Sequence, residues 1–141
     1  MLRKFIRASL FATLGLMAVV LAYGAGSASA DDKKEEKVPT ISEIMTKGHK
    51  GTDAYIAKIR AEAKAEKWDD AKEHAKTLAF FGENLGKNKP PKGDDKSWKT
   101  LTDKYGDATK AVLKATEDKD AKAVNKALGG INCGECHKAH K

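Results

Sequence analysis

Residues 68–85 read WDDAKEHAKTLAFFGENL and carry the clearest helical pattern in the chain. The side chains that recur three or four positions apart, and so share one helical face, are Ala71, His74, Ala75, Leu78, Phe81 and Leu85. Gly86 and the Lys-Asn-Lys-Pro-Pro run after it end the pattern. The spacing predicts an amphipathic helix that begins at Trp68 or Asp69 and buries one face.

Three further helical segments flank this stretch. The first is predicted to run from Thr40, which forms a capping-box pattern with Glu43, to about residue 66. The second is expected over 95–117, capped by its own Asp95 or by Ser97 and with Trp98 facing inward. The third is expected from residue 120, with Asp120 as its cap, to the C-terminus. Four helices joined by short links predict an all-α fold, an antiparallel up-and-down four-helix bundle over residues 39–141.

Gly129 and Gly130 interrupt the last of these segments. Each glycine weakens a helix by up to about 1 kcal/mol relative to alanine. We therefore expect a packing or ligand reason for the pair.

The first 30 residues have the layout of an export signal. Three basic residues lie within residues 1–7, an apolar run follows over 10–22, and Ala-Ser-Ala closes the segment at 28–30. This order predicts a cleaved secretory signal peptide and a periplasmic or secreted protein with no stable membrane span after cleavage. The alternative is an uncleaved membrane anchor.

The length, cysteine count and net charge of the chain exclude or weaken some classes of protein. The 141 residues allow one compact domain, and two cysteines exclude a disulfide-stapled scaffold. Loss of Arg3, Lys4 and Arg7 with the signal would lower the formal net charge from +7 to +4, which weakens a nucleic-acid interpretation. Residues 31–38 begin DDKKEEK and are predicted to form a disordered charged tail.

The chemistry is concentrated in Cys133-Gly134-Glu135-Cys136-His137. A Cys-x-x-Cys-His string is the attachment signal of c-type haem. Residues three and four apart share a helical face, so both thiols can form thioethers to one porphyrin while His137 binds its iron. The motif predicts one covalently attached haem c.

Three other interpretations of the two cysteines remain open. A thioredoxin-like redox pair normally lies in a βαβ context, for which the chain has no pattern. A structural zinc site needs four ligands, and His140 or a distant histidine would have to complete it. A Cys133–Cys136 disulfide would close a very small loop and stabilise little.

With its Cys-x-x-Cys-His motif in the last ten residues, the chain resembles the class II cytochromes c, the cytochrome c prime family. The resemblance rests also on Trp98 after a Pro-containing link and on the Glu66-Lys67-Trp68-Asp69 corner. It implies a haem buried between the first, third and fourth helices near one end of the bundle. It also implies that the first helix controls the sixth iron position.

The family's distal position falls on His49, where relatives carry methionine or an apolar residue. Met45 lies one helical turn earlier on the same face, so His49 and Met45 are both candidate second axial ligands beside His137. In the family, methionine on the first helix marks low-spin electron carriers, and an apolar residue there marks proteins that bind small gases. The resemblance therefore implies a low-spin monohaem cytochrome that carries electrons, with His137 proximal and His49 or Met45 distal. The alternative is an open or displaceable sixth position that binds or senses NO or CO. No acid–base constellation, phosphate loop or nucleophile elbow is evident, so we do not expect an enzyme.

The expected partners follow from the same resemblance and from the charge. Relatives often form homodimers, and an acidic redox protein would be steered by a basic rim at the haem edge. The lysines proposed for that rim are Lys87, Lys89, Lys92, Lys138 and Lys141. His74 is expected to be partly buried on its helix, and His140 to lie near solvent at a frayed terminus.

Overall fold

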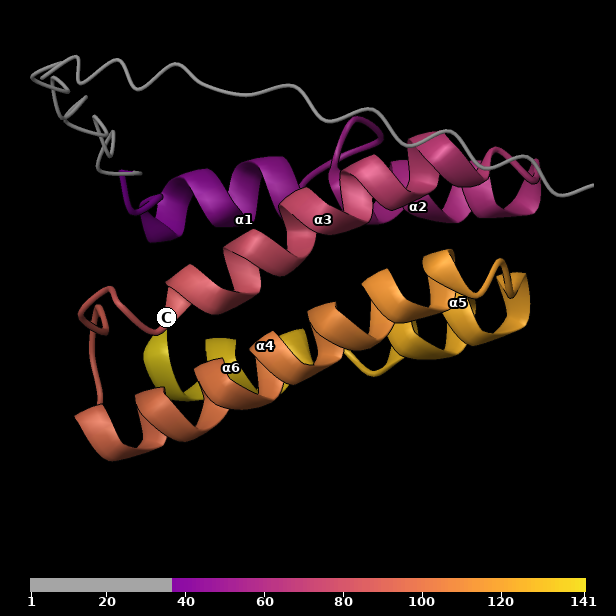
Figure 1. Ribbon diagram of the computed structural model, residues 1–141. Helices are drawn as coiled ribbons and strands as arrows, with labels where there is room; N and C mark the ends of the chain where they lie inside the picture. Colours follow the sequence, from indigo (N-terminus) through magenta and orange to yellow (C-terminus); the bar gives the residue numbers. More distant parts are fainter. Residues whose placement is uncertain (1–36) are drawn as a thin grey trace, which may run out of the picture. The chain divides into compact units, whose positions relative to one another are not determined.

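The computed structural model describes residues 37–141, so the expected signal peptide and most of the charged tail lie outside the described residues. This part of the chain contains helices and no strands (Figure 1). The helices are α1 (Ile41–His49), α2 (Tyr55–Lys64), α3 (Trp68–Leu85), α4 (Asp95–Glu117), α5 (Ala121–Gly129) and α6 (Cys133–His140). Among the described residues, no helix has the length and apolar content needed to cross a membrane.

The expectation of an all-helical fold is confirmed, and the arrangement is compatible with a helical bundle. Figure 1 shows α1 and α2 following one another along α3, while α5 and α6 both lie against α4. The longest helices, α3 and α4, form the most extensive packing pair. The two central helices along the chain, α3 and α4, thus pack side by side, with α1 and α2 along α3 and with α5 and α6 along α4, while α2 also contacts α5.

The helix starts follow the expected capping chemistry with one shift. Thr40 and Glu43 form a complete capping box at α1, with the Thr40 hydroxyl 3.2 Å from the Glu43 amide nitrogen. Asp120 caps α5 as predicted. The cap of α4 is Asp94, whose carboxylate accepts a hydrogen bond from the Ser97 amide, and neither Asp95 nor Ser97 itself.

The first expected helix is two helices. Residues 50–54 form the turn between α1 and α2, which is exposed except at the buried Ala54, and Gly51 has a φ of +83°, which favours glycine and does not fit a right-handed helix. Thr52, which the periodicity assigns to the buried face, is exposed in this turn. The apolar stripe resumes in α2, where Ile59 and Ala63 are buried.

The last expected helix is also divided. Helix α5 ends at Gly129, and α6 begins at Cys133 after a short break. The Asn132 side chain caps α6 by accepting a hydrogen bond from the Glu135 amide at 3.2 Å. The glycine pair therefore separates α5 from the helix that carries both cysteines and His137.

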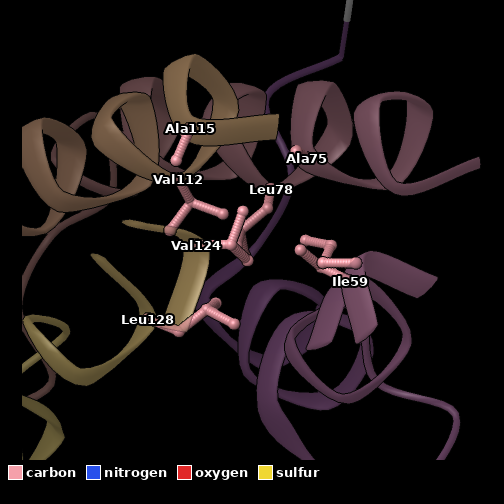
Figure 2. Packing of buried hydrophobic residues seen from close by; sticks show 8 residues of the cluster. Ile59, Ala75, Leu78, Val112, Ala115, Val124 and Leu128 are labelled. Atoms are coloured by element: carbon pink, nitrogen blue, oxygen red, sulfur yellow. The ribbon is translucent and has the colours of Figure 1, made fainter. Parts of the chain in front are cut away.

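One end of the bundle has a closed apolar core. Helices α2, α3, α4 and α5 contribute its buried side chains, and Figure 2 shows most of them converging. The members of this closed core are Ile59, Ala63, Ala75, Leu78, Val112, Ala115, Val124 and Leu128. A second cluster, named here the cavity-side cluster, consists of Ile44, Phe81, Leu85 and Trp98.

Helices α3 and α4 approach closely at Gly82. A Cβ atom at this position would clash with the Thr109 hydroxyl and would lie 3.1 Å from the Cα atom of Gly106. The Thr109 hydroxyl is itself held by a 2.8 Å hydrogen bond to the Gly106 carbonyl. The close spacing of the two central helices thus depends on the absence of a side chain at Gly82.

Candidate functional site

A cavity of about 360 Å³ lies where α1, α4 and α6 face one another. Helix α1 contributes Met45 and His49 to its wall, and α4 contributes Leu101 and Tyr105. The loop and helix at the C-terminus contribute Ile131, Cys133, Cys136 and His137. All five candidate haem ligands from the sequence therefore line one cavity.

A second cavity of about 320 Å³ adjoins the same residues. Ile41, Pro91, Trp98 and His140 are among the side chains in its wall. The residues that line both cavities are Met45, Cys136 and His137. These three side chains lie where the two hollows meet.

The hollow end of the bundle contrasts with the closed core. Helix α2 packs against α5 across the bundle, whereas α1 and α6 form no comparable packed pair within residues 37–141. Met45, Tyr105 and Cys136 contact the cavity-side cluster from the rim and are only half-buried. Side chains alone do not fill this end, and native interiors seldom leave such space empty.

The two cysteines differ in environment. Cys133 is exposed and Cys136 is half-buried, and both are free thiols. Burial, and secondarily the neighbouring Cys133, raises the pKa of the Cys136 thiol above its ordinary value. Both thiols lie on α6, three residues apart.

His49 is half-buried and paired with Tyr105. Its Nε2 atom lies 2.8 Å from the Tyr105 hydroxyl, and its buried Nδ1 atom has no hydrogen-bond partner among the described residues. Burial, and to a smaller extent the nearby His137, lowers the pKa of His49. Burial raises the pKa of Tyr105, and Cys133 adds to that effect. The pair is thus a neutral imidazole bonded to a protonated phenol.

His140 is buried, which makes the expectation of a solvent-facing terminal histidine wrong. Only 3% of its surface is exposed. Its Nδ1 atom lies 2.7 Å from the Lys92 carbonyl oxygen and its Nε2 atom 2.8 Å from the Ser97 hydroxyl. These contacts join residues more than 40 positions apart, so no local sequence pattern predicts the burial of His140. Only the inward-facing Trp98, which lies beside it, was predicted.

The remaining predicted side chains are His74 and the lysines of the proposed rim. His74 is half-buried, as expected, and its Nδ1 atom lies 2.9 Å from a Glu62 carboxylate oxygen. All five lysines of the proposed rim are exposed. At the cavity wall, Lys104 and Glu135 approach to 3.8 Å as an exposed ion pair, which contributes little to stability.

The donor set fits a haem better than a bare metal ion. Within the described part of the chain, no three His, Cys, Asp or Glu side chains are grouped closely enough to hold a metal ion by themselves. A zinc site with four protein ligands therefore has no geometric support. Two thiols, an adjacent imidazole, a mostly apolar cavity and an unpartnered buried nitrogen on His49 instead suit a large apolar ligand with its own metal.

The comparisons with known proteins assign the chain to no family. No family model, curated protein or solved structure matches the chain.

Proposed function

We propose that the chain is a monohaem c-type cytochrome that carries electrons outside the cytoplasm. The observation that carries this proposal is the convergence of Met45, Cys136 and His137 at the junction of two cavities. The Cys-x-x-Cys-His spacing supplies the chemistry, and the hollow end of the bundle supplies the room. A cytochrome c prime-like bundle is part of the same proposal.

Each site residue then has a distinct role. Cys133 and Cys136 would hold the porphyrin through thioether bonds, and His137 would bind the iron. Bound haem iron supplies one-electron transfer by alternating between its ferric and ferrous states. The apolar wall around the site would exclude water, which together with the axial side chains tunes the reduction potential.

Met45 is the sixth ligand in this proposal, with His49 as the second candidate. Two observations support this order. Met45 lines both cavities together with His137, whereas His49 lines only the larger one. The Nε2 atom of His49 is already bonded to Tyr105, so His49 could bind a metal without breaking that hydrogen bond only through its buried Nδ1 atom.

The proposed partner is an acidic redox protein. The exposed lysines near the second cavity include Lys141, which lines it, and Lys92, whose carbonyl holds His140. Positive charge at this end would accelerate encounter with an acidic protein in a salt-dependent way. A homodimer is compatible with this role.

A second candidate function is reversible binding of a small gas. One observation favours it: the cavity beside Met45 also carries the Tyr105 hydroxyl, a polar group in a mostly apolar wall. Displacement of the Met45 thioether would leave room for NO or CO next to this hydroxyl.

The deciding experiment is export of the full chain in a bacterial host that matures c-type cytochromes. Mass spectrometry should find a polypeptide that begins at Asp31 and carries one haem, and Cys133→Ser/Cys136→Ser should carry none. A wild-type product without added haem mass overturns the proposal.

Optical spectra of the same protein separate the two functions and the two ligands. An electron carrier should be low-spin and should bind CO slowly when reduced. Met45→Ala should convert the spectrum to high-spin, whereas His49→Ala should not. The opposite result would assign the sixth position to His49, and rapid CO binding by the wild type would favour gas binding.

A further inference from the structure

Helix α6 has one buried side chain, and it is the last residue of the helix. His140 is 3% exposed, Cys136 is half-buried, and the remaining residues of the helix are exposed. A short helix with so little buried surface is held mainly by its anchoring contacts. The position of α6 therefore depends strongly on what holds His140.

Three groups hold the His140 ring. The Lys92 carbonyl oxygen lies 2.7 Å from Nδ1, which must donate to it, and the Ser97 hydroxyl lies 2.8 Å from Nε2. The ring also meets Trp98 edge-on, with the ring centroids 5.2 Å apart. Gly93, at a φ of +82°, leaves the space for the ring, because a Cβ there would lie 2.8 Å from Nδ1.

The contacts around His140 and Trp98 extend to the start of α1. The Trp98 indole nitrogen donates to the Asn88 backbone carbonyl at 2.7 Å, and the Asn88 side-chain Nδ2 atom donates to the Pro39 carbonyl at 3.1 Å. Pro39 directly precedes Thr40, the N-cap of α1. One set of contacts thus ties the end of α6 and the beginning of α1 to the link between α3 and α4.

We propose that His140 is a positioning residue that fixes His137 relative to Met45. His137 lies three residues earlier on α6, and its backbone carbonyl accepts a hydrogen bond from Lys141 just after His140. Backbone hydrogen bonds fix the residues of a helix turn relative to one another, so holding His140 restricts rotation and sliding of the turn that carries His137. The role in ligation rests on the proposed function, whereas the anchoring of α6 does not.

The test compares His140→Ala, His140→Asn and His74→Ala in the exported full-length protein. Hydrogen exchange of the α6 backbone amides should accelerate at least about tenfold in His140→Ala, equivalent to 1.4 kcal/mol. Carbon monoxide binding to the reduced protein should accelerate by a similar factor, since Met45 and His137 would no longer be held at a fixed separation across the cavities that both side chains line. His140→Asn keeps an amide nitrogen near the Nδ1 position and should retain most of the protection.

His74→Ala is the matched control. His74 is a half-buried histidine whose ring is hydrogen-bonded to one side chain, that of Glu62, and it lies on α3 and lines neither cavity. Its loss should leave both α6 exchange and CO binding within about twofold of wild type. Should His140→Ala fail to fold, Ser97→Ala removes one hydrogen bond to the ring and should still raise α6 exchange severalfold.

The outcomes are distinct. Unchanged α6 exchange in His140→Ala, an equal change in His74→Ala, or no rescue by asparagine overturns the proposal. Faster exchange with unchanged CO binding overturns the positioning of His137. A purified chain without haem would overturn the proposed function instead, and its α6 exchange would still decide whether His140 anchors the helix.

Discussion

The Nε2 atom of His49 lies 2.8 Å from the hydroxyl oxygen of Tyr105 and joins α1 to α4 in the cavity wall. The two rings meet at a tilted angle with centroids 5.5 Å apart. Burial favours the neutral form of both groups, because it lowers the pKa of His49 and raises that of Tyr105. The link is thus an uncharged hydrogen bond in a mostly apolar surrounding.

Tyr105→Phe should lower the free energy of unfolding by about 1–3 kcal/mol, because it leaves the half-buried His49 nitrogen without a partner. Urea denaturation measures the change. The double variant His49→Leu/Tyr105→Phe should recover most of the loss, since it removes both polar groups. Additive losses in the double variant would show that the hydrogen bond contributes nothing.

Loss of the haem attachment should affect the two ends of the bundle differently. In Cys133→Ser/Cys136→Ser, amides of α1 and α6 should exchange faster, while the closed core between α2 and α5 should keep its protection. Apolar burial contributes about 25 cal/mol per Å², so only the hollow end loses a large stabilising term. Uniform loss of protection along residues 37–141 would contradict this division.

Gly82→Ala should destabilise the fold by about 1–3 kcal/mol, because the new methyl group would push α3 and α4 apart at Thr109 and Gly106. The midpoint of thermal or urea unfolding measures the effect. Gly129→Ala is the control: apart from its chain neighbours and its own helix backbone, no atom lies within 4 Å of its Cβ position, and alanine should raise the stability by up to about 1 kcal/mol. Equal effects at the two glycines would disprove the packing argument.

Acid should weaken the start of α4. The hydrogen bond from the Ser97 amide lowers the pKa of the Asp94 carboxyl below its ordinary value of 3.8. As the pH falls, the Asp94 carboxylate is therefore protonated in the unfolded chain before it is protonated in the folded chain. Its contribution to the free energy of unfolding is complete above about pH 5 and is lost as the pH falls below that range. Asparagine also caps helices but does not titrate.

The difference in urea midpoint between wild type and Asp94→Asn should consequently be constant from pH 7 to about pH 5 and should change in favour of the variant at lower pH. A difference that stays the same down to pH 2 would argue against a charged cap.

The sequence predicts the central helices well. Helix α3 begins at Trp68 and ends before Gly86 as expected, since an unbroken stripe, an acidic first turn and a stop signal agree there. The breaks at Gly51 and Gly129 were less visible because the apolar stripe continues beyond each turn. Periodicity alone cannot tell a continuous helix from two helices that share a face.

The candidate site was predictable to a similar degree. The motif identifies Cys133, Cys136 and His137, and helical spacing places Met45 and His49 on one face; the structure brings all of them to one cavity. The hydrogen bonds of Tyr105 and His140 join residues far apart in sequence, so no local pattern reveals them.

The contacts of Asn88 have a consequence for how much length variation this chain can accept. An inserted or deleted residue between α3 and α4 would shift Asn88 or Gly93 and with them the separation of α1 from α6. The turn between α1 and α2 is exposed over residues 50–53 and carries no such constraint there, and Gly51 has open space around it. Homologues with the same site should therefore vary in length at the first turn and keep the second link constant.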